Sequence, residues 1–234
     1  MSMTLFHLKK ENARMLIKMN KMKSEVPNQE QVWDEIAESW NERRNKTGPK
    51  ITEFVEKAKG NILDLGCGSG RNLVENKSAV FYLVDFSKNM LSLAEKKAKR
   101  LNIIYKTFKK DASDLGCFED NFFDRALFIA ALHCLDKEKR EKSLKELYRV
   151  LKHKGKVIIT IWNTNHPAFK RFKNKKEILL AWRTGKNNEK RNLRYYYFYT
   201  QEEFLKELKK AGFKVLEIED SKEHTGLFAI AEKK

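Results

Sequence analysis

A short apolar strand that runs straight into three glycines leaves this chain few possible folds. The strand covers residues 61–65, and the glycines stand at positions 66, 68 and 70. Glycine adopts positive φ and lets a ligand approach the backbone closely, so the spacing predicts a nucleoside-binding turn followed by a helix from about Gly70. The dinucleotide fingerprint G-x-G-x-x-G would need glycine where this chain has Arg71, which disfavours NAD. An ordinary glycine-rich turn without a ligand is the alternative.

Polar residues also stand at the carboxyl ends of the next three predicted strands. In chain order they are Asp85 after residues 81–84, Asp111 and Ala112 after a strand near 103–108, and His133 after residues 123–131. Because ligands of open α/β sheets bind at this edge, we expect these groups to meet the glycine turn in one crevice. A single aspartate at a strand end is usually a helix cap or turn former, but four strand ends in register favour a ligand site.

Helical and strand patterns alternate along the rest of the chain. Helices are predicted at 29–44, 49–58, 88–100, 136–151 and 200–211, a fifth strand at 156–162, and a closing hairpin from 214–218 and 227–231. This alternation predicts an α/β fold, a Rossmann-like, mostly parallel sheet of seven strands with one antiparallel strand and helices on both faces. We assign residues 27–234 to this domain and the basic residues 1–26 to an N-terminal extension.

Length and composition are consistent with a single cytoplasmic domain. The chain has 234 residues, enough to bury its own core. Its three cysteines, Cys67, Cys117 and Cys134, form no C-x-x-C pair, so we expect neither a metal site nor a disulfide framework. No segment reaches the roughly 18 apolar residues of a membrane span, and the first residues lack the apolar core of a signal peptide. We therefore expect no membrane partner and a cytoplasmic location.

The net charge of +17 indicates a polyanionic partner such as RNA. The charged fraction of 35% exceeds the roughly 25% of ordinary globular proteins, so compositional bias is the alternative. The positive charge is concentrated in an insert at 168–194, where residues 170–191 hold nine basic residues against two acidic ones. Phe169, Phe172 and Trp182 lie among them, either to stack on bases or as core anchors of a short helix.

The glycine turn and two of the acidic strand ends resemble the class I S-adenosylmethionine-dependent methyltransferases. Residues 63–70 are similar to the first motif of that family, Asp85 to its ribose-binding acid, and Asp111-Ala112 to its adenine-binding pair. The resemblance runs from about Gln31 to the C-terminus and implies that S-adenosyl-L-methionine is the cofactor. Cofactor contacts are implied for Asp64, Gly66, Gly68, Gly70, Asp85, Asp111, Ala112 and Ala130.

Three further stretches are similar to the tRNA wobble-uridine carboxymethyl methyltransferases. They are residues 32–37 with Arg44 and Pro49, residues 129–133, and residues 194–196 before the helix that Thr200 begins. The resemblance implies methyl esterification of 5-carboxymethyluridine in the tRNA anticodon loop, assisted by a small zinc-binding activator protein. Cys134 and Gly48 depart from that family's pattern, which often has a second histidine and an aromatic residue at these places.

An ionised carboxylate attacks a sulfonium methyl group without a general base, so catalysis of this reaction reduces to positioning. We expect Arg44 and Arg194 to hold the carboxylate or a neighbouring phosphate, and His133 and Tyr195 to orient the acceptor through hydrogen bonds. The alternatives are a turn cap for His133, a solvated strand position for Arg194 and a core position for Tyr195. For the whole chain, a small-molecule methyltransferase and a non-catalytic methyltransferase-like RNA-binding protein are the competing functions.

Overall fold

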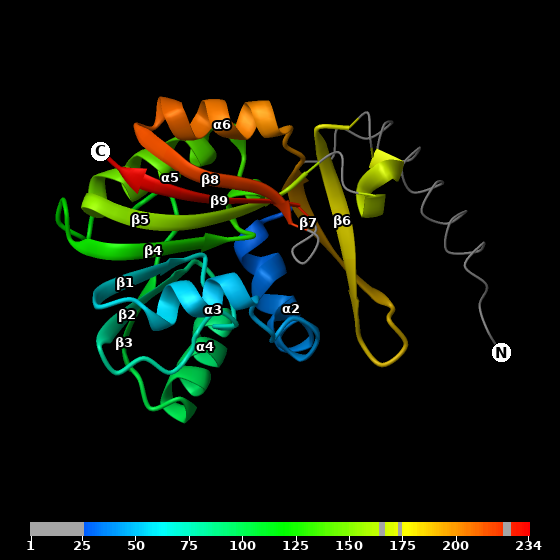
Figure 1. Ribbon diagram of the computed structural model, residues 1–234. Helices are drawn as coiled ribbons and strands as arrows, with labels where there is room; N and C mark the ends of the chain where they lie inside the picture. Colours follow the sequence, from blue (N-terminus) through cyan, green and yellow to red (C-terminus); the bar gives the residue numbers. More distant parts are fainter. Residues whose placement is uncertain (1–25, 164–166, 173–174, 222–225) are drawn as a thin grey trace.

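The computed structural model describes residues 26–163, 167–172, 175–221 and 226–234. Seven strands form one sheet in the order β3-β2-β1-β4-β5-β9-β8 (Figure 1). Strands β1 to β5 pair in parallel, and β9 runs antiparallel to both of its neighbours, which confirms the predicted mostly parallel α/β sheet. The strands are β1 (Gly60–Leu65), β2 (Ala79–Asp85), β3 (Ile104–Lys109), β4 (Phe123–Ile129), β5 (Leu151–Trp162), β8 (Phe213–Ser221) and β9 (Gly226–Lys233). The predicted N-terminal extension lies, apart from Val26, outside the described residues.

Helices cover both faces of this sheet because side chains alternate between the two faces of a strand. The helices are α2 (Gln29–Arg43), α3 (Pro49–Glu56), α4 (Lys88–Arg100), α5 (Lys137–Val150) and α6 (Gln201–Lys210). α3 and α4 pack on the face that carries Ile62 and Phe81, while α5 and α6 pack on the face that carries Leu63 and Val84. α2 lies beside the sheet, against α4 and a separate hairpin (Figure 1). In the described part of the chain, every helix is too short or too polar to cross a membrane.

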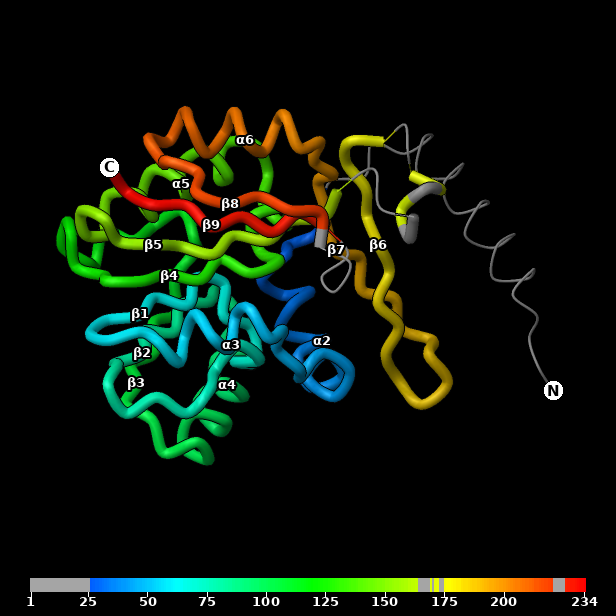
Figure 2. Tube along the Cα trace, viewed as in Figure 1, coloured from blue at the N-terminus to red at the C-terminus, as the bar shows by residue number. Residues whose placement is uncertain are grey.

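That hairpin is a second, two-stranded sheet, which projects beside the main one (Figure 2). It consists of β6 (Glu177–Thr184) and β7 (Lys190–Tyr197), which run antiparallel and contain much of the predicted basic insert. The expectation of a short helix around Trp182 is therefore wrong. Apolar residues alternate along β6 at positions 178, 180 and 182, and a strand places all three on one face.

Phe169 and Phe172 lie just before the hairpin, on the 3-10 helix η2 (Pro167–Phe172). Both rings are buried in one cluster with Tyr196 and Phe198 of the hairpin segment. They therefore anchor the hairpin to the body of the protein and do not offer exposed faces on which bases could stack.

Three element ends differ from the predictions because of local backbone geometry. No helix begins near Gly70, since residues 68–72 form successive turns and Gly70 has a φ of 76°. β4 ends at Ile129, two residues early, because Ala130 has a φ of 54°. α5 ends at Val150, one residue before the predicted end at 151, because the chain passes directly into β5.

Candidate active site

A cavity of about 340 Å³ lies at the carboxyl ends of β1, β2 and β4. Its volume is in the range of small-molecule sites. The walls come from the turns that follow these strands, from the segment after β3, and from α2 and β7. Of the residues expected to contact the cofactor, six line the cavity: Gly66, Gly68, Asp85, Asp111, Ala112 and Ala130. Asp64 and Gly70 lie outside the lining.

Asp85 ends β2 and lines the cavity, although only 6% of its surface is exposed. Oδ1 accepts a hydrogen bond from the backbone N–H of Ser87 at 2.9 Å, and Oδ2 accepts one from the backbone N–H of Gly68 at 2.8 Å. Burial raises the pKa of Asp85 to about 6, and the two hydrogen bonds oppose the shift. Each carboxylate oxygen keeps a second lone pair, so the side chain can also accept from two ligand hydroxyls.

The glycine turn brings the backbone to the cavity. Gly66 has a φ of 65°, and a Cβ atom there would lie 2.6 Å from Cβ of Ala131, so only glycine fits. This conformation places the N–H of Gly68 on Asp85. Gly70 packs against Ala94 of α4, where an added Cβ would lie 3.0 Å from the Ala94 Cα. Gly70 therefore lets the turn pack closely against α4 and does not line the cavity.

Asp64 lies on β1 and is fully buried. Neither of its carboxylate oxygens has a hydrogen-bond partner among the described residues. Burial raises the pKa of Asp64 to about 7, although the nearby Asn72 side chain and the positive charges of Arg71 and Lys97 act against the shift. Because the side chain does not line the cavity, its contact with the amino-acid part of the cofactor stays a prediction.

Asp111 and Ala112 follow β3 and line the cavity together with Lys139 of α5. Oδ1 of Asp111 accepts from the N–H and the hydroxyl of Ser113, and Oδ2 accepts from Nζ of Lys139 at 2.7 Å. Burial acts to raise the pKa of Asp111, but the hydrogen bonds from Lys139 and Ser113 outweigh it and hold the pKa below its ordinary value. The carboxylate therefore stays ionised at neutral pH and can accept from an exocyclic amine.

Ala130 turns the chain at the end of β4. Its left-handed φ of 54° is unfavourable for alanine, and its N–H donates to the hydroxyl of Thr160 at 2.9 Å. The turn leads into the 3-10 helix η1 (Leu132–Cys134), and Cys134 also lines the cavity. Backbone strain of this kind is often found where a wall must be shaped for a ligand.

Arg194 of β7 is a buried cation that forms no ion pair with a carboxylate among the described residues, and only 6% of it is exposed. One of its NH groups donates to the hydroxyl of Tyr196, and its Nε has no hydrogen-bond partner in the described structure. The ring centroids of Trp33, Trp40 and Trp182 lie 5.8, 5.3 and 4.9 Å from its Cζ, and we call this arrangement the indole cage. Trp33 and Trp40 line the cavity, whereas Trp182 and Arg194 lie outside the lining.

Tyr195 and His133 have different surroundings. Tyr195 lines the cavity, and burial raises its pKa to about 12. His133 is fully buried outside the lining, with its ring 5.0 Å from that of Trp162 and 5.6 Å from that of Tyr196. Burial lowers the pKa of His133 to about 3, and neither ring nitrogen has a partner among the described residues. His133 is therefore neutral and stacked, and its predicted hydrogen bond to the acceptor stays a prediction.

Arg71, Trp33 and Trp40 line the cavity but were not predicted as site residues. Arg71 directly follows the glycine turn and stands where the dinucleotide fingerprint has glycine, and this departure could have indicated a site residue. The two tryptophans stand in the predicted helix at 29–44, and nothing in their local pattern indicated a ligand site. Arg44 is exposed at the end of α2, 5.9 Å from the ring of Trp40, and its charge acts on Arg71. Arg44 therefore stands close to the cavity without lining it.

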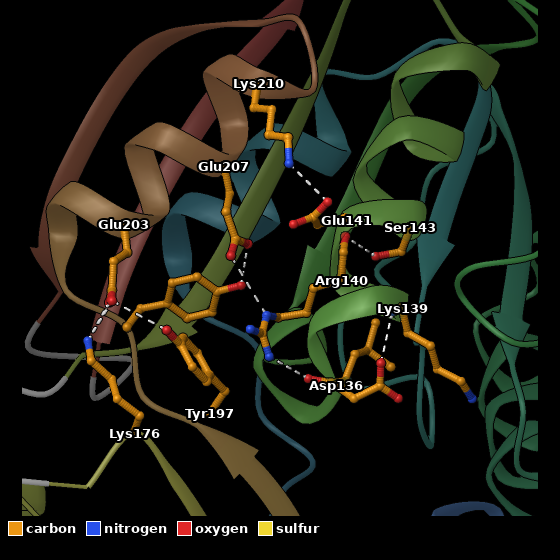
Figure 3. A network of polar contacts seen from close by, with 12 residues as sticks. Asp136, Lys139, Arg140, Glu141, Ser143, Lys176, Tyr197, Glu203, Glu207 and Lys210 are labelled. Carbon is orange, nitrogen blue, oxygen red and sulfur yellow. Dashed lines mark hydrogen bonds and ion pairs between the residues drawn. The ribbon is translucent and has the colours of Figure 1, made fainter.

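A polar network supports the wall on the side of α5 (Figure 3). Arg140 is buried, and it donates a hydrogen bond to the carbonyl of Leu135, which lines the cavity, at 2.9 Å. Its guanidinium lies 3.8 Å over the ring of Tyr197 on β7, and its Nε is 3.9 Å from Glu207 of α6. Arg140 thus connects the cavity wall to both the hairpin and α6.

Residues 63–159 match the family model of a methyltransferase domain. A curated relative, the tRNA (carboxymethyluridine(34)-5-O)-methyltransferase of Arabidopsis thaliana, is 35% identical over 134 residues. The match covers 56% of this chain and 31% of that protein. The chain therefore spans less than a third of the length of this relative.

Solved structures of low sequence identity share the fold. An S-adenosylmethionine-dependent methyltransferase from Methanosarcina mazei has a TM-score of 0.62 at 24% identity, covering 80% of this chain and 98% of that one. A methyltransferase in complex with the Haloferax volcanii Trm112 methyltransferase activator has a TM-score of 0.64 at 15% identity, covering 89% of this chain and 99% of that one.

Proposed function

We propose that this chain, whose residues 63–159 match a methyltransferase domain, is an S-adenosylmethionine-dependent methyltransferase that methylates the carboxylate of 5-carboxymethyluridine at the wobble position of tRNA. The product of this reaction is a methyl ester. The observation that carries the proposal is Arg194, whose buried charge has no carboxylate partner among the described residues. Arg194 lies outside the lining, next to the lining residues Trp33, Trp40 and Tyr195. Since an unpaired buried charge is costly, a cation this close to the cavity favours an anionic acceptor.

The lining of the cavity fits S-adenosyl-L-methionine. Asp85 would accept from the ribose hydroxyls, and Asp111 would accept from the adenine amine. The backbone of Gly66 and Gly68 would lie against the methionine part, where side chains are excluded. When bound, this cofactor supplies a methyl group activated by a sulfonium charge.

The residues around the acceptor would position it and need not remove a proton. A carboxylate with an ordinary pKa near 4 is already ionised at neutral pH. Tyr195, which lines the cavity, would orient the uracil ring. Arg194, its neighbour on β7, lies outside the lining and would attract the carboxylate through its positive charge. His133 would act indirectly by positioning Arg194, because it stacks on Tyr196, whose hydroxyl accepts from Arg194. Orientation of this kind supplies several kcal/mol of rate acceleration.

The surroundings of the cavity support an RNA acceptor. β7 forms part of the cavity wall and continues into a hairpin on which Lys186 and Arg191 are exposed. Arg43 and Arg44 extend this positive surface along the end of α2. A wobble base lies in a loop, so moving it into a pocket costs less than flipping a base out of a duplex.

We include a small zinc-binding activator protein and a cytoplasmic location in the proposal. The activator is supported by the Haloferax volcanii complex, in which a chain of the same fold binds Trm112. Its zinc would belong to the partner.

The test is a methyl-transfer assay on the full chain. The protein is incubated with labelled S-adenosylmethionine and with tRNA that carries 5-carboxymethyluridine, with and without the activator, and the labelled nucleoside is identified by mass spectrometry. We expect label in the methoxycarbonylmethyl ester, which mild alkali removes. Absence of label in RNA under both conditions, with cofactor binding intact, would favour a small-molecule acceptor.

Replacement of Arg194 tests the residue that carries the proposal. We expect Arg194→Met to lower kcat/KM for the modified tRNA by about 10-fold to 100-fold, because a charged hydrogen-bond partner contributes roughly 1.5–3 kcal/mol. Arg194→Lys should recover part of the loss, since it restores the charge without the planar donor fork. Arg100→Met, which removes an exposed arginine at the end of α4, is the matched control. Unchanged turnover in Arg194→Met would remove Arg194 from the site.

A further inference from the structure

α2 bridges the two sides of the cavity, and its first turn is fastened to β7. Oε1 of Gln29 accepts from the backbone N–H of Tyr195 at 2.9 Å, and Nε2 donates to the carbonyl of Leu193 at 3.3 Å. Gln29 and Tyr195 both line the cavity. The start of α2 is therefore tied to the side on which the acceptor is proposed to bind.

The next turn of α2 is fastened to the start of α4 through Asp34. Oδ1 of Asp34 accepts from the hydroxyl of Ser87 at 2.6 Å and from the backbone N–H of Asn89 at 3.0 Å. The backbone carbonyl of Asp34 also accepts from Nδ2 of Asn89 at 3.1 Å. Asp34 thus satisfies one of the free N–H groups at the start of α4, where a negative charge is favourable.

Ser87 stands between Asp34 and the acid that ends β2. Its hydroxyl donates to Asp34, and its backbone N–H donates to Oδ1 of Asp85. Oδ2 of Asp85 accepts from the N–H of Gly68 in the glycine turn. Hydrogen bonds therefore run without a break from α2 to the part of the cavity that binds the cofactor.

The carboxylates of Asp34 and Asp85 thus both accept from Ser87, and their like charges repel each other. A ligand whose hydroxyls donate to Asp85 offsets part of its negative charge and strengthens the position of Ser87. The same change favours the docked position of Asp34 and of α2. Trp33 and Trp40 are on this helix and line the cavity, so they would be held with it.

We propose that Asp34 is a positioning residue that makes α2, and with it the tryptophan wall of the cavity, respond to cofactor bound at Asp85. This inference rests on the methyltransferase cofactor and is independent of the proposed acceptor. Coupling of this kind is reciprocal, so loss of Asp34 should also weaken cofactor binding.

Hydrogen exchange measured by mass spectrometry tests the proposal, with S-adenosylhomocysteine as the unreactive ligand and no RNA present. The full-length wild type is compared with Asp34→Ala, with Asp34→Asn, which keeps the accepting oxygen, and with Glu38→Ala. Glu38 is exposed on the same helix and serves as the matched control. Calorimetry gives the dissociation constant of S-adenosylhomocysteine for each protein.

We expect saturating ligand to slow exchange in α2 at least fivefold in the wild type and in Glu38→Ala, and to slow it less in Asp34→Asn, which lacks the charge that opposes Asp85. In Asp34→Ala the slowing should fall below twofold even at saturation, and the dissociation constant should rise at least fivefold. Equal slowing of α2 in Asp34→Ala and the wild type would overturn the proposal. So would the absence of any ligand-dependent slowing in wild-type α2, a result that does not depend on whether a variant folds. Failure of the RNA assay would leave this outcome unaffected.

Discussion

Buried charge distinguishes the residues of this site from the rest of the core. Asp64 is fully buried without a hydrogen bond to its carboxylate among the described residues, and Asp85 is buried with two backbone donors. Burial raises the pKa of both acids, to about 7 and about 6. At neutral pH the folded protein therefore holds carboxylates that would be more stable in water.

Asp64 makes the stability of the protein dependent on pH. Its pKa in the folded protein is about 7, above its ordinary value of 3.8, so the folded state binds a proton more tightly than the unfolded state. This contribution to stability is complete below about pH 4 and is lost as the pH rises through 7. We therefore expect Asp64→Asn to raise the unfolding temperature of the cofactor-free protein at pH 8, and to raise it less at pH 5.

Thermal unfolding of wild type and Asp64→Asn at pH 5, 6.5 and 8 measures this difference. Glu119→Gln, at an exposed acid that forms no ion pair among the described residues, controls for a general effect of removing one negative charge. A difference between wild type and Asp64→Asn that stays the same at all three pH values would contradict the prediction.

At the scale of elements, the turn before α5 depends on contacts from two distant segments. Arg140 holds the carbonyl of Leu135 while its guanidinium covers Tyr197 of β7 and faces Glu207 of α6 (Figure 3). Glu207 in turn accepts from the hydroxyl of Tyr199 at 2.6 Å. One buried cation therefore aligns a cavity wall, the hairpin and a helix.

We expect Arg140→Met to destabilise the protein by about 3 kcal/mol, because it leaves a buried carbonyl without its donor and the carboxylate of Glu207 without its cation. For a chain of this size that corresponds to a fall in unfolding temperature of roughly 6–12 °C. Lys145→Met, an exposed change on the same helix, should have little effect. Thermal unfolding of both variants measures the difference.

The double variant Arg140→Met with Glu207→Gln should lose less stability than the sum of the two single variants. The interaction between Arg140 and Glu207 is already lost in either single variant, so the second change cannot remove it again. Additive losses would mean that Arg140 and Glu207 do not interact in solution.

For the whole molecule, the net charge of +17 is distributed unevenly over the described surface. Many lysines pair with acids, as in Lys50 with Glu217 and Lys176 with Glu203. Lys186 and Arg191 of the hairpin form no such ion pair among the described residues. These two side chains are therefore free to contact phosphates, and they lie on the hairpin whose strand β7 reaches the cavity.

We expect the affinity of the protein for tRNA to fall at least 100-fold between about 50 mM and 200 mM salt, because basic side chains release counterions when they bind phosphates. Lys186→Glu with Arg191→Glu should weaken binding and reduce the slope of log K against log salt by about 2. Fluorescence anisotropy of labelled tRNA measures both quantities.

The matched control is Lys206→Glu with Lys209→Glu, which makes the same change of charge on the exposed side of α6. If this control lowers the affinity as much as the hairpin variant does, net charge rather than the hairpin surface determines binding.

The sequence by itself determined the strands and helices of the main sheet and the side of the cavity where we propose that the cofactor binds. These features depend on short-range geometry: alternation along strands, positive φ at Gly66, and an acid that directly follows a strand, as at Asp85. The same local reasoning failed at Gly70 and Trp182, where a turn replaced a helix start and a strand replaced a helix. Position 64 holds an acid, as the predicted cofactor contact requires, but only the structure showed that Asp64 is buried outside the cavity lining.

Only the tertiary structure decided the acceptor side. The indole cage joins α2 to the hairpin, and the hydrogen bond from Trp182 to Ser39 that accompanies it spans 143 residues of sequence. No local pattern encodes such a contact, because it depends on how two separate elements pack against each other. The same packing places His133 against the rings of Trp162 and Tyr196, removes Arg194 from solvent and brings Asp34 to the start of α4. Local backbone preferences thus specify where the cofactor can bind, and long-range packing specifies what faces it.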